Sequence, residues 1–246
     1  MVRHEHRSRT LKPFLSFWES TTSEEVARER ARYVLKPIIE YHKQAEKILE
    51  IGCGIGEVLV NLPESYTIYG LDIGKDYIEV CKKKIPEGKF YVSSMHNFKI
   101  DERFDVIFSV YAINFLRDFS HWKSTFKAVN EHLNIDGLFI FDAYTPKILR
   151  DTLQSLKKHD RSTSSVKEFA KGYYYEKETV KGDTRILDTG IFERLPNGLY
   201  QLNKYRRKER IYPVAKMKRA LSEHFDILEA NLREEGRKIL FVCRKK

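Results

Sequence analysis

One short stretch constrains the fold of this chain more than any other: Ile48-Leu49-Glu50-Ile51-Gly52-Cys53-Gly54-Ile55-Gly56. An apolar run that contains a carboxylate predicts a central parallel strand. Glycines at alternate positions then permit a tight turn and let a ligand approach the backbone closely. About 20 residues further on, a second apolar run ends in Asp72, where a ribose-binding carboxylate is expected. Together these features predict a site for a nucleoside-containing cofactor. The alternative is a strand-to-helix turn that binds no ligand.

The spacing of the glycines separates the cofactor classes. Dinucleotide-binding folds use Gly-x-Gly-x-x-Gly, whereas this chain has Gly52-x-Gly54-x-Gly56, preceded by Glu50. The chain here resembles the class I S-adenosylmethionine-dependent methyltransferases, whose first motif reads Glu/Asp-x-Gly-x-Gly-x-Gly. The resemblance implies S-adenosyl-L-methionine as the cofactor. It further implies that Glu50 faces the methionine ammonium, that Gly52 and Gly54 line the cofactor, and that Asp72 binds the ribose hydroxyls.

The composition of the chain narrows the classes of protein to which it can belong. The 246 residues suffice for one α/β domain with an addition, and 41% hydrophobic residues are typical of a folded chain. No apolar run approaches the roughly 20 residues of a membrane helix, and the basic N-terminus lacks the apolar stretch of a signal peptide. Cys53, Cys81 and Cys243 are scattered, which argues against a disulfide framework or a metal site. We therefore expect a cytoplasmic protein without a membrane or metal partner.

Alternating apolar segments predict a Rossmann-like α/β fold, with a seven-stranded, mostly parallel sheet and helices on both faces. An Asp136-Gly137 turn is expected before the fifth strand. Expected strands lie near 48–51, 67–71, 90–92, 104–109 and 138–142, with an antiparallel closing pair at 225–229 and 239–243. Expected helices follow a cap at Thr22-Ser23 and lie near 56–62, 75–84, 122–133, 147–158 and 214–223.

The segment before the closing pair is longer than a crossover needs. About 80 residues lie there, where a helix of roughly 10–15 would suffice. Strand patterns at 173–180, 185–195 and 199–211 are separated by two hairpin turns, which predicts a small antiparallel sheet inserted over the active site. We expect three parts: an N-terminal arm and cofactor-binding core (1–145), an inserted helix and sheet forming a substrate cap (146–212), and the last helix with the closing strands (213–246).

The resemblance extends through residues 93–98 and 104–116. In many family members an aspartate near the adenine amino group stands where this chain has Ser94. An N-terminal segment often folds over the cofactor in such enzymes, and Phe14, Phe17 and Trp18 are its expected anchors, although a docking arm or frayed terminus is an alternative. Besides the residues named above, the resemblance implies cofactor contacts from Cys53, Gly56, Ile73, Ser94, Met95 and Ser109.

Residues 110–116, which follow the fourth expected strand, indicate the kind of substrate. This run lacks the Asn/Asp-Pro-Pro-Tyr pattern of enzymes that methylate nucleic-acid bases, and it resembles small-molecule enzymes, including the dTDP-aminosugar N-methyltransferases. In some of those a histidine stands at the place of Phe115. Tyr111 and Asn114 are the candidate catalytic residues, and Asp142 and Tyr144 are expected to face the substrate. The predicted function is methyl transfer to an amine or hydroxyl of a small molecule.

Basic residues are concentrated between 201 and 220, in a chain whose net charge is +10. On a strand, Arg206 and Arg207 point to opposite faces. Such residues are suited to binding phosphate, either on a nucleotide-linked small molecule or along RNA, and a solvated sheet edge is the structural alternative. Three alternatives stay open: an RNA methyltransferase, a non-catalytic cofactor-binding subunit, and a homodimer formed through the inserted sheet.

Overall fold

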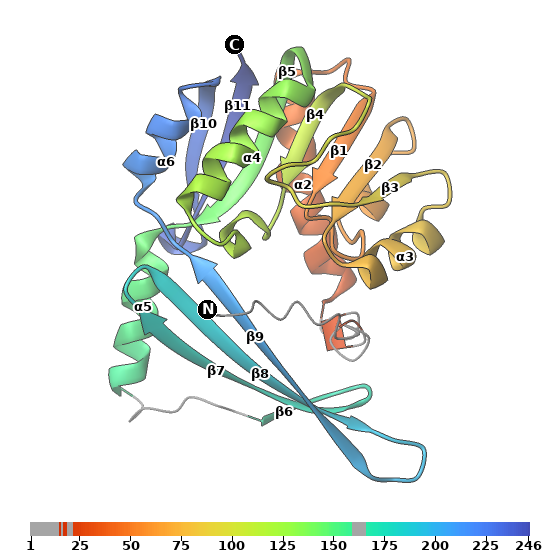
Figure 1. The fold of residues 1–246 in the computed structure, drawn as a ribbon, viewed down its shortest axis with the longest axis vertical. Coiled ribbons are helices and arrows are strands. Elements are labelled where there is room, and N and C mark those ends of the chain that lie inside the picture. The colour runs from red at the N-terminus through yellow and green to blue at the C-terminus, as the bar shows by residue number, and fades with distance from the viewer. Residues whose placement is uncertain (1–14, 16, 19–21, 159–165) are drawn as a thin grey trace, which may run out of the picture.

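A seven-stranded sheet forms the centre of the computed structural model, which describes residues 15, 17, 18, 22–158 and 166–246 (Figure 1). The strand order is β10-β11-β5-β4-β1-β2-β3. Strands β1 to β5 run parallel, whereas β11 is antiparallel to both of its neighbours. The predicted mixed Rossmann-like sheet is therefore confirmed. Its strands are β1 (Lys47–Ile51), β2 (Thr67–Asp72), β3 (Lys89–Val92), β4 (Phe104–Ser109), β5 (Leu133–Tyr144), β10 (Phe225–Arg233) and β11 (Lys238–Lys245).

Helices cover both faces of this sheet, because each presents one apolar stripe to it. On one face, Trp122 and Phe126 of α4 join Leu221 of α6 in a single buried cluster. On the other face, Val34 of α2 and Ile78 of α3 belong to a second cluster. The helices are α2 (Glu24–Tyr41), α3 (Lys75–Lys84), α4 (Phe119–His132), α5 (Pro146–Lys158) and α6 (Val214–Leu221).

Local structure departs from the sequence-based expectation at two places. The helix expected over 56–62 is a single 3-10 turn, Leu59–Asn61. Gly56 has a left-handed φ of 74° and Leu62, before Pro63, is extended, so neither end of the segment is helical. The Asp136-Gly137 turn lies inside β5, where Asp136 has a φ of 63°. There the register with β4 shifts, so the expected turn is a bulge within a longer strand.

The inserted sheet is confirmed and has one strand more than predicted. Its order is β6-β7-β8-β9, all antiparallel, and β6 was not foreseen. The chain leaves the central sheet after β5, passes through α5, and returns from β9 to α6 (Figure 1). The strands are β6 (Val166–Phe169), β7 (Gly172–Lys181), β8 (Thr184–Arg194) and β9 (Tyr200–Arg210).

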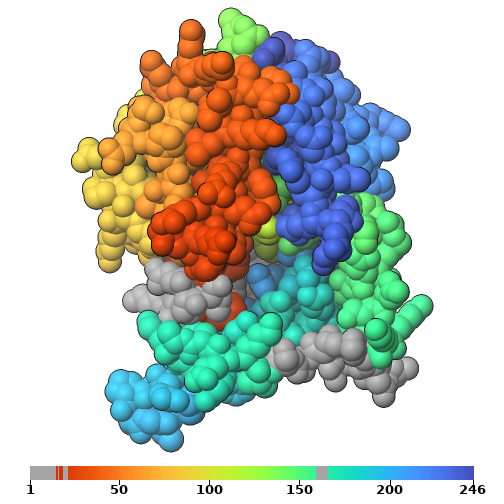
Figure 2. All heavy atoms as spheres, turned by 180° about the vertical axis from the view of Figure 1, so that it is seen from behind, coloured from red at the N-terminus to blue at the C-terminus, as the bar shows by residue number. Residues whose placement is uncertain are grey.

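One face of the inserted sheet is turned toward the core of the protein. On β8, Leu187, Thr189 and Ile191 are buried, and in an antiparallel sheet their cross-strand partners share that face. Those partners include Arg207 and Tyr205, whereas Arg206 pairs with Asp188 on the opposite face. We call the side that carries Leu187 the inner face. Viewed from behind, this sheet lies below α2 and the β10–β11 hairpin (Figure 2).

Two N-terminal side chains link the central and inserted sheets. Phe17 is buried, with its ring 4.6 Å from that of Tyr174 and 5.7 Å from that of Phe169. Trp18 Nε1 donates a hydrogen bond to Glu57 Oε2 at 3.1 Å. The third expected anchor, Phe14, lies outside the described residues. Within the described part of the chain, no helix is both long and apolar enough to cross a bilayer.

Candidate functional site

The glycine loop follows β1 at the centre of the sheet, where β1 separates β4 from β2. Gly52, Gly54 and Gly56 all have left-handed φ angles, of 77°, 51° and 74°, which side chains disfavour. A Cβ at Gly52 would lie 2.6 Å from Ala112 Cβ and 2.8 Å from Met95 Cε, whereas a Cβ at Gly54 would meet nothing within 4 Å. Gly52 therefore permits close packing, and Gly54 is the position where a ligand can lie against the backbone.

Asp72 joins this loop to the end of β2. Its Oδ2 accepts a hydrogen bond from the N–H of Gly54 at 3.0 Å, and its Oδ1 accepts one from Gly74 at 2.8 Å. Burial raises the pKa of the Asp72 carboxyl, and the backbone donors oppose that shift. The next side chain, Ile73, is 72% exposed and offers an apolar surface beside the carboxylate. This pairing of an acid with an apolar contact suits a nucleoside.

Glu50 supplies the sharpest test of whether the predicted cofactor fits. The residue is 3% exposed, and its Oε2 has no hydrogen-bond partner among the described residues. Burial raises the pKa of this carboxyl well above its usual range. A buried acceptor without a donor costs about 1–3 kcal/mol. The cationic ammonium of S-adenosylmethionine would satisfy it, so the residues present fit this group.

Other predicted cofactor residues have partners within the protein. Ser109 Oγ donates to the carbonyl of Ile51 at 2.9 Å, and so ties β4 to β1. Cys53 Sγ lies 4.0 Å from Cys81 Sγ, and both thiols are buried and free. Ser94 Oγ lies 2.5 Å from His96 Nδ1. That contact with His96 was not foreseen, and it means that the histidine orients the hydroxyl at this position.

Tyr111 lies beyond β4 in a strained backbone conformation. Its φ is 59°, which is uncommon for a bulky residue and marks a position held by its surroundings. Its N–H donates to Asp142 Oδ1 at 2.6 Å, and its hydroxyl donates to Glu234 Oε1 at 2.8 Å. Burial and the Glu234 hydrogen bond raise the pKa of Tyr111. The phenol is therefore protonated and precisely oriented at neutral pH.

Two residues of the β10–β11 hairpin complete this cluster. Lys238 is 3% exposed, with its Nζ 3.0 Å from Glu234 and 3.5 Å from Asp142. The Nζ also lies 2.8 Å from the centre of the Tyr111 ring. Burial lowers the pKa of Lys238, and the two carboxylates oppose that shift. Sequence reasoning missed Glu234 and Lys238; a lysine that opens an apolar strand was the only local signal.

Asn114 and Tyr144 occupy the junction between the two sheets. Asn114 Nδ2 donates to the carbonyl of Arg210 at 2.7 Å, and Asn114 Oδ1 accepts from the N–H of Tyr144 at 2.9 Å. Both polar ends of this amide are therefore engaged with backbone, one in β9 and one in β5. The Tyr144 ring lies 5.0 Å from Lys238 Nζ and 5.8 Å from Arg185 Cζ, so Tyr144 belongs to the same polar cluster as Tyr111.

The predicted basic residues separate onto the two faces of the inserted sheet. Arg206 forms two hydrogen bonds with Asp188 on the outer face. Arg207 pairs with Glu176 on the inner face, and its charge acts on Tyr77 of α3, as does that of Asp72. The structure therefore brings Arg207, but not Arg206, toward the cofactor side of the central sheet.

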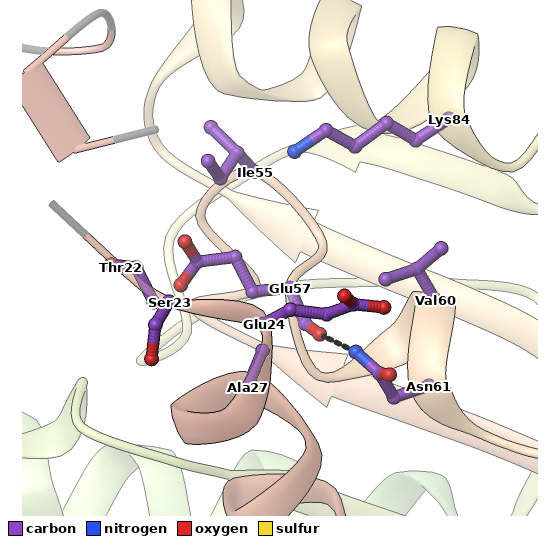
Figure 3. Close-up of a pocket in the computed structure, with 9 residues that line it drawn as sticks. All are labelled: Thr22, Ser23, Glu24, Ala27, Ile55, Glu57, Val60, Asn61 and Lys84. Atoms are coloured by element: carbon purple, nitrogen blue, oxygen red, sulfur yellow. Dashed lines mark hydrogen bonds between the residues drawn. The ribbon is translucent and has the colours of Figure 1, made fainter. Parts of the chain in front are cut away.

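An open cavity lies beside the glycine loop rather than over it. It has a volume of about 540 Å³, and it lies between the start of α2 and the segment after Gly54 (Figure 3). The Asn61 side chain closes one wall through a 2.9 Å hydrogen bond to the carbonyl of Glu57. Because Glu50, Gly54 and Asp72 are not among its lining residues, we place the candidate site at those three residues and not in this cavity.

Comparisons with known proteins agree with this geometry. Residues 48–137 match the methyltransferase domain family. A malonyl-[acyl-carrier protein] O-methyltransferase from Bacillus anthracis is 26% identical over 161 residues, which cover 60% of this chain and 59% of that protein. Across the first curated relatives, the chain spans roughly half of their length, 59% and 49% for the first two. The match to the family model is thus confined to residues 48–137, which hold the glycine loop and Asp72.

Solved structures extend the likeness to almost the whole chain. An S-adenosylmethionine-dependent methyltransferase from Clostridium acetobutylicum has a TM-score of 0.81 at 18% identity, covering 96% of this chain and 99% of that one. An amino pentose methyltransferase from Micromonospora echinaspora, with S-adenosylmethionine bound, has a TM-score of 0.73 at 16% identity and covers 99% of this chain and 100% of its own. The predicted fold, a Rossmann-like sheet with an inserted antiparallel sheet, is thus shared with these solved structures.

Proposed function

We propose that this protein binds S-adenosylmethionine and transfers its methyl group to a nucleophilic atom of a small molecule. The observation that carries the proposal is the unpaired, buried oxygen of Glu50 beside the open backbone of Gly54. The match of residues 48–137 to the methyltransferase domain family supports it. When bound, the cofactor supplies an electrophilic methyl group on a sulfonium.

The protein's own contribution to this reaction is to hold and enclose the reactants. Glu50 accepts from the ammonium, Gly54 leaves room along the loop, and Asp72 faces the ribose. Phe17 and Trp18 lie between the glycine loop and the inner face of the inserted sheet. We propose that this arm and residues 146–212 form the cap that excludes water from the site.

Tyr111 and Glu234 form the proposed acceptor side. The Tyr111 hydroxyl donates a hydrogen bond to Glu234. Its oxygen can therefore accept a hydrogen bond from the N–H of a substrate. Burial raises the pKa of Glu234, but Lys238 and the Tyr111 hydrogen bond outweigh it and hold that pKa below its usual value. A carboxylate whose pKa is lowered is a weaker base than an ordinary glutamate. The site therefore suits an amine that enters in its neutral form, which then needs orientation and no strong base.

The arginines of the inserted sheet help to decide between a small amine and RNA as the substrate. We favour a small amine over RNA, because Arg206, Arg207 and Arg210 each already pair with a carboxylate of the inserted sheet. Paired arginines release fewer counterions on binding a polyanion. The structural neighbour from Micromonospora echinaspora is an amino pentose methyltransferase, which is consistent with this choice. A homodimer through the inserted sheet stays a prediction.

Calorimetry and methyl transfer together test the proposal. We expect the purified chain to bind S-adenosylmethionine and S-adenosylhomocysteine, and to transfer labelled methyl to members of a panel of amines and amino sugars, more than to matched alcohols. Binding of NAD in place of both ligands would falsify the cofactor assignment. Binding without transfer to any amine, alcohol, carboxylate or RNA in the panel would favour a non-catalytic subunit.

A further inference from the structure

Two buried polar atoms of opposite character lack partners near the glycine loop. Glu50 Oε2 is an acceptor without a donor, and Arg30 Nε is a donor without an acceptor, among the residues that the structure describes. The Arg30 charge reaches Glu50, since it lowers the pKa of that carboxyl against the stronger effect of burial. Unpaired buried groups are expensive. A pair of such atoms, one of each sign, is complementary to a ligand that carries both charges.

Arg30 is held at the site by contacts that use only part of its guanidinium. Its Nη1 lies 3.3 Å from Glu57 Oε2, and the side chain is 15% exposed. Its Cζ lies 4.3 Å from the centre of the Tyr111 ring. The same Glu57 oxygen also accepts a hydrogen bond from Trp18. A guanidinium has five N–H donors in a fork that matches a carboxylate, so a single 3.3 Å contact leaves most of that capacity available.

We propose that Arg30 binds the carboxylate at the amino-acid end of the cofactor, while Glu50 accepts from the ammonium on the same carbon. The assignment rests on the proposed function and adds to it a residue from α2, an element outside the matched domain. An α-amino acid group presents an anion and a cation a few bonds apart. Arg30 and Glu50 are complementary to that pair, and charge-assisted bonds of this kind are the strong ones.

The competing explanation is that Arg30 only supports the loop through Glu57. Glu57→Gln distinguishes this supporting role from carboxylate binding, because it removes the Arg30–Glu57 ion pair and keeps the guanidinium. Arg30→Met removes the guanidinium while retaining an unbranched apolar chain, and Arg30→Lys restores the charge without the fork. Circular dichroism and thermal unfolding of each variant establish that it is folded before binding is measured.

The second part of the experiment compares three ligands that differ at the amino-acid end. S-adenosylmethionine has the carboxylate, its decarboxylated analogue lacks only that group, and 5′-methylthioadenosine lacks the whole amino-acid part. By calorimetry, we expect the wild-type chain to bind S-adenosylmethionine about 10- to 100-fold more tightly than the decarboxylated analogue. Arg30→Met should lose that preference and leave affinity for 5′-methylthioadenosine unchanged. Arg30→Lys should retain part of the preference, and Glu57→Gln should retain it.

Each contrary result has a distinct meaning. An Arg30→Met protein that weakens all three ligands equally, or a Glu57→Gln protein that loses the preference, overturns the carboxylate assignment in favour of a supporting role. A wild-type chain that binds the first two ligands equally also overturns it, and leaves the proposed function intact. A wild-type chain that binds none of the three refutes the proposed function, and the assignment with it.

Discussion

Asn114 should stabilise the attachment of the inserted sheet to the core, and its removal should be measurable as a loss of stability. The residue is 5% exposed, and its amide bridges the N–H of Tyr144 and the carbonyl of Arg210. Replacing Asn114 by Ala leaves both backbone groups without their partner. One lies at the end of β5 and the other at the end of β9, so the change acts on both sheets at once.

The size of the expected loss in the free energy of unfolding follows from the burial of those two backbone groups. An unsatisfied buried donor or acceptor costs about 1–3 kcal/mol, and we take the lower part of that range because Tyr144 and Arg210 are half-buried. The expected loss is about 2–4 kcal/mol in the free energy of unfolding. For a chain of this length, each kcal/mol lowers Tm by about 2–4 °C, so Asn114→Ala should lower Tm by about 4–16 °C.

Urea unfolding of three variants tests this reasoning. Asn114→Asp keeps the acceptor for Tyr144 but sets a buried carboxylate against the Arg210 carbonyl, so its cost should shrink as pH falls and the introduced carboxyl becomes protonated and can donate. Asn231→Ala is the control: Asn231 is exposed on β10, its side chain bonds that of Glu229, and the change should alter stability by less than about 0.5 kcal/mol. An Asn114→Ala protein as stable as this control would refute the stabilising role of Asn114.

Three further changes probe the site itself. Gly54→Val should abolish measurable S-adenosylmethionine binding, whereas Gly182→Val, at a glycine with φ of 57° and equally open surroundings, should leave it intact; equal binding by both variants contradicts the loop assignment. Burial raises the pKa of Glu50 in the free protein and a bound ammonium lowers it, so binding should release protons and tighten as pH rises from the bound-state pKa to the free-state pKa. Calorimetry in buffers of different ionisation enthalpy measures this release, which Glu50→Gln should remove. Tyr111→Phe should lower kcat by about 10- to 100-fold with cofactor affinity unchanged, and an unchanged kcat would exclude Tyr111 from orienting the acceptor.

The cofactor side of the site was largely predictable from the sequence. The loop over 52–56 and the carboxylate of Asp72 are produced by neighbours in the chain, because left-handed turns select glycine and parallel strands end at one edge of the sheet. The same local logic located α3 and β4 at their observed bounds. It failed over 56–62, where the left-handed backbone of Gly56 and the extended Leu62 leave room for one 3-10 turn.

The acceptor side was only partly predictable. Tyr111 and Asn114 were selected because they follow β4, yet their bonding differs: Tyr111 donates to Glu234, and Asn114 joins β5 to β9. No pattern near either residue specifies those partners. They are set by where the β10–β11 hairpin and the inserted sheet return to the core.

The sequence alone determined the fold class, the glycine loop and the carboxylate that follows it, since each depends on backbone preferences and periodicity within a few residues. Tertiary structure decided the rest. It buried Lys238 between Asp142 and Glu234, turned the face with Arg207 rather than the face with Arg206 toward the core, and brought Arg30 of α2 within electrostatic reach of Glu50. Such contacts join segments far apart in the chain, and their energies come from burial and charge, which exist only once the distant segments have packed together.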